Sequence, residues 1–69
     1  MQLKEYISNL DTKTLKTISA NLGISYLYLY QIASHYRMPS PRLAVAIEKA
    51  TSGQVSRYEL RPDAKEIWD

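Results

Sequence analysis

Apolar residues recur at helical spacing on both sides of Gly23. The spacing of three and four positions is shared by Leu15, Ile18 and Leu22 before the glycine, and by Leu29, Ile32, Ala33 and Tyr36 after it. Such spacing places side chains on one face of a helix. It predicts one helix that ends at Leu22 and a second that runs from Ser25 to about Tyr36.

The residues between these two helices suit a tight turn. Gly23 can adopt the left-handed conformation that ends a helix, because it has no Cβ atom. Ile24 can then enter the core, and the Ser25 side chain can cap the N–H groups of the next helix. A helix, a tight turn and a capped helix predict a helix-turn-helix motif at about residues 14–36.

A first helix is predicted at residues 2–10, which carry one apolar face made by Leu3, Tyr6, Ile7 and Leu10. Asp11 or Thr12 then offers a side-chain cap for the second helix. After the third helix, Pro39 and Pro41 prevent the helix from continuing. These features place three helices before the proline-containing connection.

A fourth helix is predicted to begin at Ser40 and Pro41, because serine is a good cap and proline a good first helical residue. Four residues are expected to line its inner face: Leu43, Ala46, Ile47 and Ala50. Residues 51–53 contain Gly53 and are expected to end this helix. The small alanines would let it approach its neighbours closely.

The C-terminal segment is predicted to hold a short fifth helix. Ser56 and Glu59 have the spacing of a capping box, and Val55 before them is expected to be a core anchor. A short strand is the alternative, because Val55, Tyr58 and Leu60 roughly alternate. The capping box favours the helix. The last six residues either add a turn that packs on the body or fray.

Composition limits the chemistry that this chain of 69 residues can perform. With no cysteine and a single histidine, His35, neither a disulfide nor a metal site is expected, and no other cofactor is expected. No nucleophile is paired with His35 and an acid, and no glycine-rich phosphate loop is present, so we do not expect an enzyme. No apolar run approaches the ~20 residues of a membrane span, and a cytoplasmic location is expected.

The net charge of +2 is small, but its distribution is uneven. Residues 1–42 contain two acidic residues (Glu5 and Asp11) and five basic ones (Lys4, Lys13, Lys16, Arg37 and Arg42). From residue 43 onward there are four basic and five acidic residues. The positive field therefore covers the predicted helix-turn-helix, as a surface that faces phosphates requires. Chance asymmetry in a small protein is the alternative.

Two stretches resemble a known group of proteins. Gly23-Ile24-Ser25, followed after five residues by Gln31, is similar to the turn of Cro-like repressors of lambdoid phages and of the related YdaS-type antitoxins. The run AIEKATSGQVSRYELRPD, from Ala46 to Asp63, resembles a segment that members of this group carry at the same place. The resemblance implies a lambda-repressor-like DNA-binding domain, from a group of small, dimeric or dimerising regulators that are common in prophages.

Pattern and resemblance together predict an all-α fold. We expect a single five-helix, helix-turn-helix domain over residues 1–69 with a short C-terminal tail. The expected function is transcriptional regulation: a Cro-like prophage repressor that binds a palindromic operator as a dimer. The alternative is an antitoxin or anti-repressor, a protein-interaction module that uses its tyrosine-rich third helix to bind a toxin or repressor protein.

In a helix-turn-helix, the second helix presents its outward residues to base edges in the major groove. The outward positions, and thus the predicted base contacts, are Ser25, Tyr26, Leu27, Tyr30, Gln31 and Ser34. Gln31 can bond to N6 and N7 of adenine, and Leu27 can pack on a thymine methyl group. An operator with A·T pairs opposite this helix is therefore expected.

The start of the third helix departs from the resembling group, whose members usually have small or polar residues there. This chain has the run YLYLY from Tyr26 to Tyr30. Tyr28 lies near the inward edge, so it is either a packing residue or part of the exposed face. For Tyr26 and Tyr30 we favour DNA contact over a protein interface, in which tyrosine is also enriched.

Phosphate contacts are predicted on the flanks of this helix: Lys13, Thr14, Lys16, Thr17, Arg37 and Arg42. The N–H groups at the start of the second helix are expected to help. Arg57 and Arg61 are left out, because Glu59 and Asp63 are close in sequence and are expected to neutralise them.

The expected partners are double-stranded DNA and a second copy of the chain. So short a chain has a small core and a stability of only ~3–5 kcal/mol, which favours dimerisation. The dimer surface is predicted in residues 52–69, which contain Val55, Tyr58, Ile67 and Trp68. For Trp68, packing in the core is the alternative.

Overall fold

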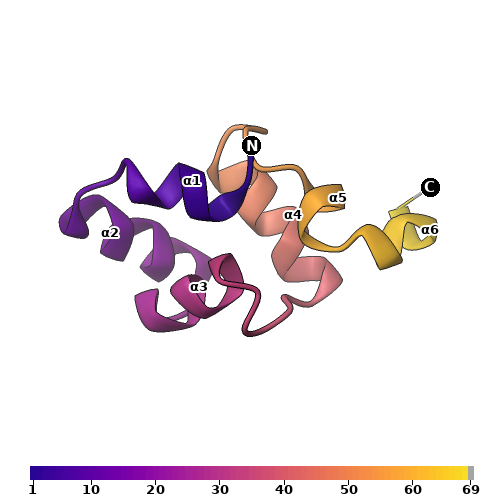
Figure 1. The fold of residues 1–69 in the computed structure, drawn as a ribbon, viewed down its shortest axis with the longest axis horizontal. Coiled ribbons are helices and arrows are strands. Elements are labelled where there is room, and N and C mark those ends of the chain that lie inside the picture. The colour runs from indigo at the N-terminus through magenta and orange to yellow at the C-terminus, as the bar shows by residue number, and fades with distance from the viewer. Residues whose placement is uncertain (69) are drawn as a thin grey trace.

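The computed structural model of the chain describes residues 1–68, and every regular element within them is a helix. The elements are α1 (Leu3–Ser8), α2 (Thr12–Leu22), α3 (Tyr26–Ala33), α4 (Pro41–Ala50), α5 (Arg57–Leu60), a 3₁₀ turn η1 (Pro62–Ala64) and α6 (Lys65–Trp68). Helices α1 to α5 gather into one body, and α6 lies at one end of it beside the C-terminus (Figure 1). The Cα radius of gyration is 11.1 Å, close to the ~11 Å expected of a compact chain of this length.

Side-chain caps begin the main helices where the sequence predicts them. The confirmed caps are Asp11, which accepts from the Thr14 N–H (2.7 Å), Ser25, which accepts from the Tyr28 N–H (3.1 Å), and Ser40, which accepts from the Leu43 N–H (3.1 Å). Pro41 is the first residue of α4, as predicted. Gly23 ends α2 in the left-handed conformation with φ 75°, also as predicted.

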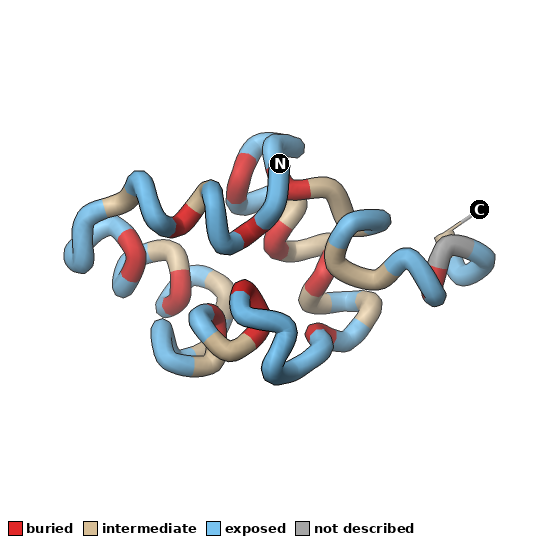
Figure 2. The backbone as a smooth tube through the Cα atoms, in the orientation of Figure 1, coloured by how far each residue is buried: buried red, intermediate tan, exposed pale blue. Residues whose placement is uncertain are grey.

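The core lies where α1, α2, α3 and α4 meet (Figure 2). Its buried side chains are Leu3, Ile7, Leu15, Leu29, Ile32, Ala33, Ile47 and Val55. Helix α3 packs on α1 and α2, and α4 packs on α2 and α5. Val55 is 0 % exposed, so its predicted role as a core anchor is confirmed.

The third helix is shorter than predicted, and the prediction that Tyr36 shares the apolar face of Leu29, Ile32 and Ala33 is wrong. α3 ends at Ala33, and Tyr36 is 82 % exposed. The N–H groups of Tyr36 and Arg37 both donate to the carbonyl of Gln31, at 2.8 and 3.2 Å. His35, the residue before Tyr36, adopts φ 63°, which turns the chain away from the helical path and carries Tyr36 to the surface.

The inner face of α4 also differs from the prediction. Ala50 is exposed, whereas Ala44 and Ile47 are buried. Both Ala50 and Thr51 follow Ile47 at helical spacing, three and four positions on, and the residue that continues the buried side is Thr51. The buried Thr51 hydroxyl donates to the Glu48 carbonyl and accepts from the Val55 N–H, both at 3.1 Å, so its burial leaves no polar atom unpaired.

The capping box that opens α5 is confirmed in both halves: the Ser56 side chain accepts from α5, and the Glu59 carboxylate accepts from the Ser56 N–H at 3.3 Å. The strand alternative for residues 54–60 is therefore not observed. Beyond the five predicted helices, the described residues add η1 and α6. Trp68 packs edge-on against Tyr58, with the ring centroids 5.5 Å apart, while Ile67 is 68 % exposed.

None of the helices in residues 1–68 has the length and apolar character that crossing a membrane requires.

Candidate nucleic-acid interface

Helices α2 and α3 are joined by a closed turn that fixes how α3 is presented. The Gly23 N–H donates to the Ala20 carbonyl and the Ile24 N–H to the Ser19 carbonyl, both at 3.0 Å. Ile24 is half-buried and packs against the core, and the small Ser19 is buried in α2. One side of α3 is thereby held against the body, and its other side faces solvent.

The predicted base-contact residues lie on this outer side of α3. Ser25, Tyr26, Leu27, Tyr30 and Ser34 are exposed, and Gln31 is half-buried. The rings of Tyr26 and Tyr30 meet edge to face with centroids 6.3 Å apart. Tyr30, Gln31 and Ser34 line one shallow cleft together with Tyr36, which the sequence did not assign to the site.

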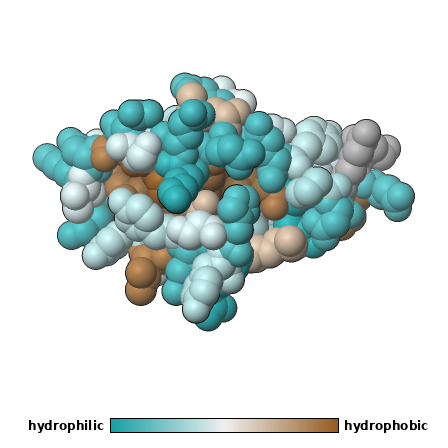
Figure 3. Space-filling model, in the orientation of Figure 1, coloured by the Kyte–Doolittle hydropathy of each residue, from teal (hydrophilic) through white to brown (hydrophobic). Residues whose placement is uncertain are grey.

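Of the two alternatives for Tyr28, the structure supports a packing residue, because Tyr28 is half-buried and lies against the core cluster. The exposed part of the YLYLY run is therefore Tyr26, Leu27 and Tyr30. Leu27 is 61 % exposed, which is a large apolar side chain to leave in water. The space-filling view shows hydrophobic atoms over α3 at the edge of the molecule, surrounded by polar ones (Figure 3).

A cation links α2 to this aromatic surface. The Lys16 Nζ atom lies 5.5 Å from the centroid of the Tyr26 ring, within the range of a cation–π interaction. Sequence spacing predicts the Tyr26–Tyr30 pair, which is four positions apart on one helix. It does not predict Lys16 beside Tyr26, because that contact depends on how two helices pack.

The other predicted phosphate contacts near α3 are exposed. They are Lys13, Thr14 and Thr17 in α2 and Arg37 in the connection to α4. The Thr17 hydroxyl donates to the Lys13 carbonyl at 3.0 Å, so its proton is already used within the helix. In the described part of the chain, no carboxylate forms an ion pair with Lys13, Lys16 or Arg37.

The start of α2 is a poorer phosphate site than the sequence suggested. The Asp11 carboxylate already accepts from the Thr14 N–H at 2.7 Å. Its hydrogen bonds with Thr14 lower the pKa of Asp11 below the ordinary value, so the carboxylate is ionised at neutral pH. A negative charge at this helix start competes with a phosphate for the N–H groups. The lysines, rather than the helix end, carry the positive potential.

Arg42 lies apart from the other predicted contacts. It is exposed near the start of α4, where it lines a groove with Lys49, Ile67 and Trp68. The structure therefore places Lys16 beside the α3 surface, with Lys13 three positions before it on α2, and assigns Arg42 to a different surface.

The prediction that Glu59 neutralises Arg57 is wrong. Arg57 pairs with Glu48 through Nη2 (2.6 Å) and Nε (2.8 Å), and its backbone N–H also donates to Glu48 (3.1 Å). Glu59 instead accepts from the Ser56 N–H and from the Met1 amino group. The packing of α4 on α5 brings Glu48 to Arg57, and this cannot be read from sequence distance.

The expected pairing of Arg61 with Asp63 is confirmed. Arg61 donates from Nε and Nη2 to the two Asp63 oxygens, at 2.9 and 2.7 Å, and from Nη1 to the Pro39 carbonyl at 2.9 Å. The last bond ties the α3–α4 connection to the segment after α5. These arginines therefore hold the fold together.

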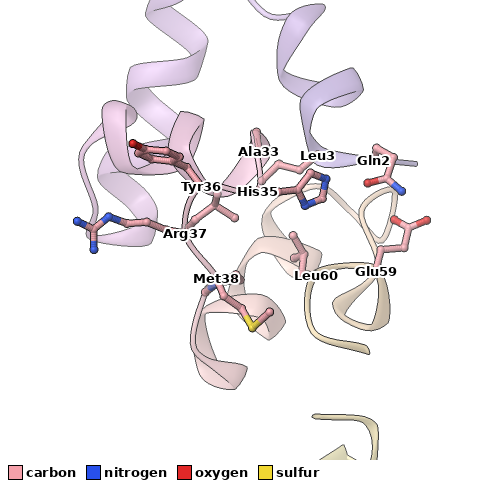
Figure 4. A pocket seen from close by; sticks show the side chains of 11 residues that line it. Gln2, Leu3, Ala33, His35, Tyr36, Arg37, Met38, Glu59 and Leu60 are labelled. Carbon is pink, nitrogen blue, oxygen red and sulfur yellow. The ribbon is translucent and has the colours of Figure 1, made fainter. Parts of the chain in front are cut away.

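A cavity of about 270 Å³ lies behind the end of α3, between the start of α1, the α3–α4 connection and α5 (Figure 4). The His35 ring points toward Gln2 and Glu59, whereas Arg37 points to the other side. The sequence did not indicate this cavity, because three separate segments form it. It is smaller than most small-molecule sites, which begin at about 300 Å³.

Together these features define a class of protein: small and all-helical in its described residues, with α2 exposing cations that have no carboxylate partner there and α3 exposing an aromatic surface. A family model described as "Bacterial toxin YdaS" matches residues 14–67, from α2 into α6. The chain therefore belongs to this family, which agrees with the resemblance to the YdaS-type group. The description names a toxin, whereas the resemblance implied an antitoxin or a Cro-like repressor. No curated protein matches the chain.

Proposed function

We propose that this protein is a sequence-specific DNA-binding transcriptional regulator in which α2, the turn at Gly23 and α3 act as a helix-turn-helix. The observation that carries the proposal is the exposed outer side of α3 beside Lys13 and Lys16, which have no carboxylate partner among the described residues. In this arrangement α3 enters the major groove and α2 lies against the phosphate backbone.

Different side chains on α3 would make different contacts with the bases. Gln31 would read adenine through two hydrogen bonds, and Leu27 would pack on a thymine methyl group. The Ser25 hydroxyl accepts the Tyr28 N–H, which leaves its own proton free to donate. Tyr26, Tyr30 and Ser34 complete the proposed base contacts.

Phosphate binding is proposed for Lys13, Thr14, Lys16 and Arg37, with Arg42 as an outlying contact. Thr17 would join them only by turning its hydroxyl from the Lys13 carbonyl to the phosphate. The ring of Tyr26 limits the freedom of Lys16, because the two are held within 5.5 Å. A restrained cation loses less conformational entropy when it binds a phosphate.

We further propose that the chain binds a palindromic operator as a homodimer and represses transcription by occupying a promoter. Two recognition helices related by a two-fold axis would enter half-sites about 34 Å apart. The exposed Tyr58, in residues 52–69, supports an interface in that segment.

The experiment is a selection from a pool of random duplexes, followed by affinity measurements at several salt concentrations. The Gln31→Ala substitution should cost ~1–3 kcal/mol on the selected sequence and almost nothing on random DNA. Equal losses on both would remove Gln31 as a base contact. A chain that enriches no sequence, and whose weak binding does not depend on salt, would contradict the whole proposal.

A protein-interaction function is the second candidate, and two observations favour it. The rings of Tyr26 and Tyr30 are exposed beside Leu27, and the family description names a toxin. The same side of α3 would then bind a partner protein. Retention of such a partner, its loss with Tyr30→Ala and the absence of salt-sensitive duplex binding would favour this function over DNA recognition.

A further inference from the structure

A groove runs along α4 on a different surface from the outer side of α3. The half-buried Val45 and Ala46 form its floor, Ile67 and Trp68 of α6 form one wall, and the exposed Arg42 and Lys49 stand at its edge. Its volume is about 490 Å³, and it opens widely to solvent. The α4–α6 groove is thus an apolar channel that carries two positive charges.

The wall of the α4–α6 groove is anchored through its tryptophan. Trp68 lies edge-on to Tyr58 and 5.6 Å from the Arg57 guanidinium, and Arg57 is itself fixed by Glu48 at 2.6 Å. This chain of contacts connects α6 to α5 and α4. The groove is therefore a formed feature of the fold.

The two cations of the groove have a regular spacing. Arg42 and Lys49 are seven positions apart, which is two helical turns and about 10 Å along α4. Among the described residues that line the groove there is no carboxylate. A ligand that matches the groove must therefore supply negative charges at this spacing and apolar groups between them.

This charge pattern decides between occupants. A second copy related by a two-fold axis would place the same surface on both sides of the contact, and its four cations would repel one another. A phosphate backbone would match the cations but would leave Ile67 and Trp68 against a polar ligand. A helix with acidic and apolar residues on one side satisfies both the charges and the apolar floor.

We propose that the α4–α6 groove binds an acidic amphipathic helix of a partner protein. Two carboxylates seven positions apart on that helix pair with Arg42 and Lys49. Apolar side chains at the third and fourth positions between them pack on Val45, Ala46 and Ile67. The small Ala46 permits a close approach of the two helices. This interaction leaves α3 free and shares only the outlying contact Arg42 with the proposed DNA function, so its tests use Lys49 and Ala46.

The test uses the full chain and two synthetic helical peptides of identical composition. The matched peptide has glutamates seven positions apart with leucines at the third and fourth positions between them. The control peptide has the glutamates moved to the opposite side of the helix. Fluorescence anisotropy should show salt-sensitive binding of the matched peptide and about tenfold weaker binding of the control. Equal affinities, or no binding of either peptide, would overturn the proposal.

A charge exchange tests the pairing itself. Lys49→Glu should weaken binding of the matched peptide. A peptide in which one of the two glutamates is replaced by lysine should bind the Lys49→Glu chain with the original affinity and should bind the unchanged chain less tightly. Lys4→Glu, the same charge change on exposed α1, is the control and should leave the affinity unchanged. Loss of binding in both variants, or in neither, would overturn the assignment. Circular dichroism melts establish that the variants are folded.

The other occupants are distinguished by two measurements. Ala46→Arg should block the matched peptide without changing self-association in sedimentation equilibrium. Dissociation of a dimer by Ala46→Arg would instead assign the groove to a second copy of the chain. If Lys49→Ala lowers the salt slope of DNA binding relative to the unchanged chain, the α4–α6 groove binds phosphates. Either result overturns the acidic helix and leaves the role of α3 in DNA binding to be judged on its own test.

Discussion

The α2–α3 region and the segment from α5 to α6 use their basic residues in different ways. Lys13 and Lys16 in α2 are exposed and have no carboxylate partner in the described part of the chain. Arg57 and Arg61 are each held by a carboxylate. The net charge of +2 conceals this difference. Pairing, more than the number of charges, separates a surface available to a polyanion from one that stabilises the fold.

The paired charges also affect their acidic partners. The Arg57 guanidinium and N–H hold the pKa of Glu48 below its ordinary value, and Arg61 does the same to the pKa of Asp63. In the α2–α3 region, by contrast, Lys16 contacts an aromatic ring. The C-terminal segment is thus stabilised by ion pairs, while the lysines of α2 form no ion pair among the described residues.

The largest predicted effect separates the two sides of α3. Leu29 is 1 % exposed and Leu27 is 61 % exposed, although they lie two positions apart. Leu29→Ala should cost ~2–5 kcal/mol of unfolding free energy, enough to unfold most of the chain. Leu27→Ala should change the unfolding free energy by less than about 0.5 kcal/mol but weaken binding to the selected duplex. Urea titrations followed by circular dichroism measure the free energy of unfolding, and fluorescence anisotropy measures the affinity for the duplex.

The next prediction compares a cation of α2 with one of α4. Lys16→Ala should weaken binding to all duplexes alike and lower the salt slope by about one unit, because one phosphate contact is lost. Lys49→Ala is the matched control and should leave the slope unchanged. An unchanged slope for Lys16→Ala would remove this lysine from the DNA surface.

A smaller, local effect is expected from Arg57→Ala. This change removes the pair with Glu48 and the contact with the Trp68 ring. The α6 helix should loosen, and acrylamide should quench the fluorescence of Trp68, the single tryptophan, more strongly. Affinity for a single half-site, which does not depend on the proposed dimer interface, should not change. If acrylamide quenches Trp68 no more strongly than in the unchanged chain, or if half-site affinity falls, the α2–α3 region and the α5–α6 segment do not act separately.

The smallest effect concerns pH. The pKa values of Asp11, Glu48 and Asp63 are lowered in the folded chain by their hydrogen-bond donors. Protonation therefore favours the unfolded chain, and stability should fall as the pH drops below about 4. Urea midpoints at neutral and acidic pH measure this loss. Glu48→Gln should make it smaller, and a midpoint that rises on acidification would contradict the assignment.

Local sequence signals predicted most of the backbone. Caps at Asp11, Ser25 and Ser40 and the left-handed Gly23 depend on residues within four positions, and all were found in place. Periodicity also identified Leu29, Ile32 and Ile47 as core residues. Such features are local, so a single sequence contains the information that determines them.

The errors arose where distant segments meet or where a helix ends early. Tyr36 continues the apolar spacing of α3, but the bonds to the Gln31 carbonyl stop the helix before it. Glu48 reaches Arg57 only because α4 packs on α5. The contact of Lys16 with Tyr26 and the cavity near His35 likewise need the tertiary structure. For the candidate site, the sequence indicated which residues are exposed, and the structure showed which of them lie together.

The central claim is that the exposed side of α3 and the unpaired cations of α2 contact DNA. Amide chemical-shift mapping by NMR, with the selected duplex added to the full chain, tests it most directly. The largest shifts should fall in residues 13–17 and 25–34, decrease as salt is added, and leave residues 57–68 almost unchanged. Shifts concentrated in α5 and α6, or no salt-sensitive shifts in α2 and α3, would contradict it.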